Sequence, residues 1–130
     1  MFSKTERLLY SIVGSTSTNA LPFACAVDMV CDLLFTEKLS RGNIRVTKDV
    51  YPVVAERLGK STAAVTRRIS YFGNLCWDMA VKENRVVELF GRPLCEAPST
   101  ADLLVYFAVL LHYGTPFFTV METPDLEVEG

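Results

Sequence analysis

The stretch Asp49–Ile69, DVYPVVAERLGKSTAAVTRRI, decides the fold of this protein. It holds a short apolar segment, a glycine at Gly59, and a longer apolar segment that opens on two hydroxyl residues. A hydroxyl suits a helix N-cap, and glycine takes turn dihedrals that other residues avoid. Ala55, Gly59 and Val65 stand at helix-turn-helix spacing, in which a small alanine allows close approach and valine fills the shared core. The stretch therefore predicts two helices joined by a tight turn.

Helical patterns flank this pair on both sides. Before the turn we expect a short helix after the capping-box spacing at Ser3–Glu6, one from Pro22 through Leu34, and one ending at Leu58. After it we expect a helix from Ser61 or Thr62 to about Ala80, one over Arg85–Phe90, and one from the second capping box at Ser99 to about Tyr113. Ser15–Asn19 predicts a loop. Alternating strand patterns are absent, so we expect an all-α fold: about six helices in a compact bundle around the helix-turn-helix.

The helix expected over about 62–80 has two distinct faces when it is projected at about 100° per residue. Its inner stripe comprises Val65, Ile69, Phe72, Cys76 and Ala80. Its outward side comprises Ala63, Arg67, Ser70, Tyr71 and Asn74, with Thr66 at the edge. Such an outward side suits a recognition helix in the DNA major groove, where an arginine reads guanine or a phosphate. The alternative is a solvated polar face, which every surface helix has.

The charge distribution favours the recognition helix. The 130 residues carry a net charge of −2, which by itself argues against a nucleic-acid partner. The segment 41–68, however, has a net charge of +5, so the remainder carries −7. Its basic residues are Arg41, Arg45, Lys48, Arg57, Lys60, Arg67 and Arg68. Binding to phosphates requires cations concentrated on one surface, not a basic total.

Several motifs of the chain also resemble a known family. These are Tyr51-Pro52 with the helix-turn-helix, Trp77 twelve residues after Val65, Leu89-Phe90-Gly91, and Pro98 with the helix after it. Together they resemble the C-terminal effector domain of the stage zero sporulation protein A, the response regulator that controls entry into endospore formation. The resemblance covers about residues 4–113.

The resemblance implies a six-helix, cytoplasmic, sporulation-type transcription regulator that binds double-stranded DNA through the major groove. Arg67 matches a basic family position and is the best candidate for base contact. Combining both arguments, the residues expected at DNA are Lys48, Lys60, Ser61, Thr62, Thr66, Arg67, Arg68, Ser70, Tyr71 and Asn74. The chain departs from the family at Ala64, Ser70 and Tyr71, where the family is basic or polar, and at Arg68, where it has a small residue. A different DNA site preference is expected.

As a second departure, we expect no phosphoacceptor receiver domain, and therefore regulation by expression level, self-association or a partner. The alternative function is a degenerate helix-turn-helix interaction module that has lost DNA binding and acts by self-association or by pairing with another regulator. An apolar last helix motivates this alternative, because Leu103–Leu111 has no polar face.

After residue 113 the sequence is first apolar and then acidic. We therefore divide the chain into an effector-like domain, 1–113, and a tail, 114–130. Pro116–Met121 is predicted to cover the last helix within the chain, and a homodimer surface formed by both is the alternative. The acidic residues that follow are Glu122, Asp125, Glu127 and Glu129. A solvated tail is the simplest interpretation of them, and a mask for the basic helix pair is the alternative.

The sequence gives little reason to expect a metal site, a membrane partner or an enzyme. The four cysteines form no Cys-x-x-Cys pair, and the one histidine, His112, lies in an apolar run, so no metal site is predicted. We expect reduced, mostly buried thiols. The longest apolar run is about half of a bilayer span, so no membrane partner is expected. Without a glycine-rich phosphate loop or a nucleophile with its base, we expect no enzyme, cofactor or small-molecule substrate.

Overall fold

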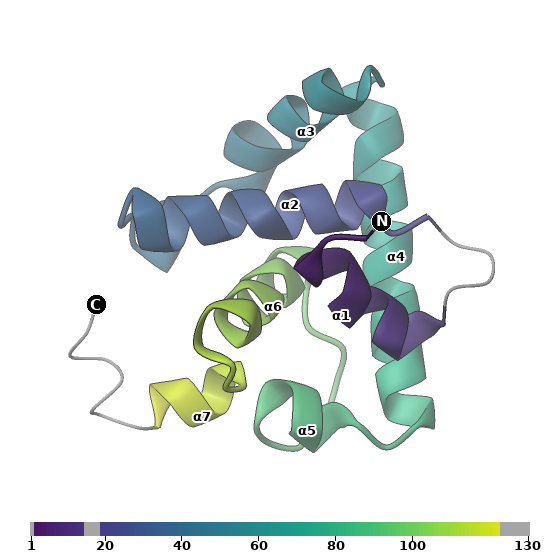
Figure 1. Ribbon diagram of the computed structural model, residues 1–130, viewed down its shortest axis with the longest axis vertical. Coiled ribbons are helices and arrows are strands. Elements are labelled where there is room, and N and C mark those ends of the chain that lie inside the picture. The colour runs from purple at the N-terminus through teal and green to yellow at the C-terminus, as the bar shows by residue number, and fades with distance from the viewer. Residues whose placement is uncertain (1, 15–18, 123–130) are drawn as a thin grey trace.

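The computed structural model describes residues 2–14 and 19–122, which form helices joined by short turns (Figure 1). In these residues the α-helices are α1 (Lys4–Val13), α2 (Leu21–Cys31), α3 (Tyr51–Leu58), α4 (Thr62–Lys82), α5 (Val86–Phe90), α6 (Thr100–Tyr113) and α7 (Phe117–Met121). Between α2 and α3 lie the π-helical segment η1 (Asp32–Thr36), the 3₁₀ turn η2 (Arg41–Asn43) and the π-helical segment η3 (Val46–Val50). No strand occurs in the described ranges. The predicted all-α fold is confirmed, with seven α-helices where about six were expected.

Serine hydroxyls cap three of the helices, as their sequence spacing predicts. At α1 the Glu6 amide donates to the Ser3 hydroxyl and the Ser3 amide donates to the Glu6 carboxylate, each at 3.1 Å. At α6 the Asp102 amide donates to the Ser99 hydroxyl, also at 3.1 Å. The Asp102 carboxylate accepts from Arg41 at 2.6 Å, which ties η2 to the start of α6.

The core lies where α2, α4 and α6 meet. α2 packs against both α4 and α6, and α1 packs against α2 and α4. The predicted inner stripe of α4, from Val65 to Ala80, is buried. Gly73 allows the close approach of these helices, because a Cβ there would lie 3.3 Å from the Phe23 ring and 3.4 Å from Leu103. The helix α4 therefore packs tightly against α2 and α6 at Gly73.

The chain itself covers the apolar helix α6. Its residues from Leu103 to Val109 are all buried, and α7 packs against α6. The Tyr106 and Phe117 rings lie 4.6 Å apart, and Phe117 and Val120 belong to the core. The packed core thus extends past residue 113, into the segment predicted as a tail.

The two ends of the molecule carry different elements. Figure 1 shows α3 and the first turns of α4 at one end, and α5 and α7 at the other. Residues 15–18 of the predicted loop, and the tail residues 123–130 with Asp125, Glu127 and Glu129, lie outside the described residues.

Candidate nucleic-acid interface

The turn between α3 and α4 has the geometry that the sequence predicts. Gly59 adopts left-handed dihedrals (φ 66°, ψ 35°), a conformation that costs little only for glycine. The Lys60 amide donates to the Ala55 carbonyl at 3.0 Å and the Gly59 amide to the Glu56 carbonyl at 3.3 Å, which is a Schellman closure. Val54, Ala55, Val65 and Ile69 fill the space between the two helices. This packing fixes the direction in which α4 leaves the turn.

Ser61 is the N-cap residue of α4. The Ala64 amide donates to its hydroxyl at 3.1 Å, so the serine oxygen satisfies one free amide of the first turn. The hydroxyl proton stays available as a donor, since only the oxygen is used as the cap. Thr62 is the first residue of the helix, and its side chain is exposed. The start of α4 therefore presents two hydroxyls beside amides that favour an anion.

The outward side of α4 is accessible along its first three turns. Arg67, Tyr71 and Asn74 are exposed, and Tyr71 is 63% exposed although its ring is apolar. Thr66 and Ser70 are only half-buried, because they stand at the edges of this side. These five residues form one continuous stripe at helical spacing, as predicted.

Lys48 belongs to η3, in front of α3, and its side chain is exposed. The Arg45 amide donates to the Asp49 carboxylate at 2.9 Å, which closes the first turn of η3. The eight residues of α3 separate η3 from the turn, a rise of roughly 12 Å. Lys48 and Lys60 therefore stand at opposite ends of α3.

Arg41 does not belong to the interface, although the local charge of +5 includes it. Its guanidinium pairs with Asp102 and lies 5.1 Å from the centre of the Phe117 ring. It serves the packing of α6 and α7. Without Arg41, the segment that holds the helix pair has a net charge of +4.

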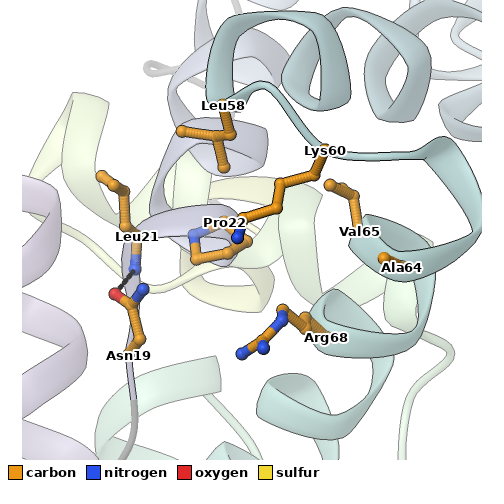
Figure 2. Close-up of a pocket in the computed structure, with 8 residues that line it drawn as sticks. All are labelled: Asn19, Leu21, Pro22, Leu58, Lys60, Ala64, Val65 and Arg68. Carbon is orange, nitrogen blue, oxygen red and sulfur yellow. Dashed lines mark hydrogen bonds between the residues drawn. The ribbon is translucent and has the colours of Figure 1, made fainter.

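Arg68 faces a different direction from Arg67. It lines a cleft of about 190 Å³ between the start of α2, the end of α3 and the start of α4. Figure 2 shows the Lys60 and Arg68 side chains reaching into this cleft from the helix-turn-helix, with Asn19 and Leu21 on the other side. The structure thus brings Lys60 and Arg68 together and places Arg67 on the outward side.

The contribution of α2 to this cleft is not predictable from the sequence pattern. The Leu21 amide donates to the Asn19 side-chain oxygen at 2.9 Å, which caps the start of α2. An asparagine shortly before a helix that begins with proline in its first turn is a typical start signal. That local signal predicts the cap, but it does not predict that the capped end lies against α4.

The cysteine thiols are poor nucleophiles where burial is high. Desolvation raises the pKa of Cys76 to about 12 and, together with the nearby Asp28 and Asp32 carboxylates, that of Cys31 to about 11. Within residues 2–14 and 19–122, no group of three or more His, Cys, Asp or Glu side chains is placed to hold a metal ion. No helix in those same ranges is long and apolar enough to cross a membrane.

Comparison of the chain with protein-family models, with curated proteins and with solved structures found no match.

Proposed function

We propose that this protein binds double-stranded DNA as a transcription regulator, with α4 lying in the major groove. The observation that carries the proposal is the exposed stripe of α4 next to a basic helix-turn-helix. Arg67 stands in the second turn of that stripe, where a recognition helix contacts base edges. Lys60 and the hydroxyls of Ser61 and Thr62 lie at the start of α4, and Lys48 lies at the other end of α3. Side chains of these types contact backbone phosphates.

The resemblance to the sporulation effector domain supports the same proposal. It supplies the class of regulator and the major-groove docking. Control of sporulation-type genes rests on that resemblance alone. The departures at Arg68, Ser70 and Tyr71 lie in the contact region, so the site sequence of this protein differs from that of the family.

Selection of bound duplexes from a random DNA pool tests this function. We expect enrichment of a defined site, and retention of that site that weakens steeply with salt, because counterion release dominates such affinity. A matched scrambled duplex is the control. If no duplex is retained at about 50 mM salt, the proposal fails.

A second candidate is an interaction module that does not bind DNA. The observation in its favour is an apolar cleft of about 260 Å³ between η1, α6 and α7, lined in part by Leu34, Phe35, Val109 and Met121. Met121 is half exposed at its rim. Sedimentation analysis separates the two candidates: this one predicts a dimer that Met121→Glu dissociates, together with no affinity for DNA.

A further inference from the structure

The cleft beside the helix-turn-helix has polar groups of one sign. Lys60 approaches it from the turn, and Arg68 approaches it from the second turn of α4 (Figure 2). No carboxylate is among the residues that line it. Apolar side chains of Leu21, Pro22 and Leu58 form much of the remaining wall. Two cations therefore face the same small volume without an anion between them.

Neither cation is neutralised elsewhere in the described part of the chain. The ion pairs found there join Arg41 to Asp102 and Arg85 to Glu88. Like charges that share a site repel each other, so a bound anion lowers the free energy of this arrangement. The Lys60 and Arg68 side chains are both exposed, so an anion from solution can reach them.

Size and donor geometry indicate which anion fits. A water molecule occupies about 30 Å³, so about 190 Å³ admits one tetrahedral oxyanion with several waters. An arginine fork pairs with two oxygens of a phosphate, and a lysine supplies a point charge. The Asn19 side-chain oxygen is used by the Leu21 amide, which leaves the NH₂ group of Asn19 as a third donor.

The position of the cleft indicates where the phosphate comes from. Arg68 follows Arg67 on α4, so the two side chains point about 100° apart. When Arg67 enters the major groove, Arg68 lies on the flank of the helix, where a DNA backbone borders the groove. A phosphate free in solution could bind the cleft without this placement of Arg68 beside Arg67, whereas a backbone phosphate of DNA in the groove depends on it.

We infer that this cleft holds one backbone phosphate of the bound duplex, between Arg68 and Lys60. The inference rests on the proposed function and extends it to α2, whose capped start forms one wall of the site. It is not implied by the resemblance, in which the Arg68 position holds a small residue. Arg67 then reads sequence while Arg68 fixes the register of the protein on the duplex.

A neutral-phosphate scan tests the inference. Each phosphate of the selected duplex is replaced in turn by an uncharged methylphosphonate, and binding is measured for the wild-type protein, Arg68→Ala and Lys82→Ala. We expect one position at which the replacement weakens wild-type binding about tenfold and Arg68→Ala binding less than about twofold. Lys82→Ala removes a cation from the last turn of the same helix, and it should keep the wild-type pattern.

The salt dependence gives a second measure that needs no particular site. Loss of one phosphate contact should reduce the slope of log affinity against log salt by about 1 for Arg68→Ala and leave it unchanged for Lys82→Ala. Thermal unfolding of both variants checks that they fold. Arg68→Lys should retain part of the effect, because it keeps the charge and loses the fork.

The outcomes separate this inference from the proposed function. If the wild type binds duplex DNA but Arg68→Ala keeps the full sensitivity at every phosphate, the cleft does not hold a backbone phosphate and the proposed function stands. If the wild type binds no duplex, both are wrong. Inorganic phosphate that shifts the Leu21 and Ala64 amide resonances of the wild type but not of Arg68→Ala, without duplex binding, would make this a free-phosphate site and overturn the backbone assignment.

Discussion

Arg67 and Lys48 have different tasks in the proposed complex, although both are exposed cations. Arg67 is on the outward stripe of α4, and Lys48 is in η3 before α3. A bidentate contact to a base contributes roughly 1–3 kcal/mol of discrimination, whereas a phosphate contact carries no sequence information. We expect Arg67→Ala to lower the affinity for the selected site and flatten the preference at one base pair.

Lys48→Ala is the matched comparison for Arg67→Ala. It should weaken binding to selected and scrambled duplexes by the same factor, and it should reduce the salt slope by about 1. Competition titrations with single-base variants of the site measure both effects. If both variants lose the same amount of sequence specificity, Arg67 does not contact a base.

The cysteines provide a test of burial at single residues. Cys76 lies in the inner stripe of α4 with its pKa raised to about 12 by desolvation, whereas Cys95 is exposed. Because the thiolate is the reactive form, Cys76 should react with a disulfide reagent at pH 8 only through global unfolding. Cys95 should react at once, and Cys95→Ser should remove that fast phase. Fast labelling of Cys76 in the native protein would contradict the packing of α4.

Among the elements, those with local signals were predictable from the sequence. Ser3, Gly59 and Ser61 mark helix ends by their own chemistry, and the structure places helix ends at all three. The π-helical segments η1 and η3 were not predicted, since nothing in their residue pattern distinguishes an i+5 hydrogen bond from an α-helical one. The segment Pro116–Met121 was predicted to cover the last helix, but its helical conformation in α7 was not predicted.

The direction of Arg68 could not be predicted because it depends on tertiary packing. Helical projection places Arg68 away from the outward stripe, but it does not say what lies beside it. The start of α2 occupies that place, although Leu21 precedes Arg68 by 47 residues in the chain. Candidate residues on α4 could therefore be identified from sequence, and their division into an outward stripe and a cleft required the fold.

The attachment of α7 depends on Gly91, the residue that ends α5. Gly91 has φ +99°, and a Cβ there would lie 2.8 Å from the backbone nitrogen of Thr119 in α7. Gly91→Ala should therefore combine backbone strain with overpacking, and destabilise the protein by about 3 kcal/mol. Denaturant unfolding measures this loss, and binding of a hydrophobic dye should report the uncovered face of α6.

Gly42→Ala is the control for that substitution. Gly42 lies in η2, and a Cβ there meets nothing within 4 Å. We expect a change within about 0.5 kcal/mol. Equal stability of the two alanine variants would show that Gly91 does not lie this close to Thr119 of α7.

At the scale of the whole molecule, the positive charges are concentrated in one segment, 41–68, and the remainder of the chain is acidic. The sequence pI is about 5.4, yet the segment with the helix pair is basic, and Figure 1 places α3 and the first turns of α4 at the end opposite α5 and α7. Screening confines electrostatic interactions to roughly 10 Å at 0.1 M salt, so a bound polyanion responds to the nearest cations and not to the net charge.

The protein should therefore bind a heparin column at pH 7.5 although its net charge there is negative. We expect elution by salt well above about 0.1 M, and earlier elution of the double variant Lys60→Ala/Arg68→Ala, which removes the two cations of the cleft. The double variant Lys38→Ala/Lys82→Ala loses the same charge outside the cleft, since Lys82 is the last residue of α4 and Lys38 follows η1. It should elute with the wild type, because the cations around the turn between α3 and α4 are intact. Passage of the wild type through the column at low salt, or equal shifts for the two double variants, would show that these cations do not act as one surface.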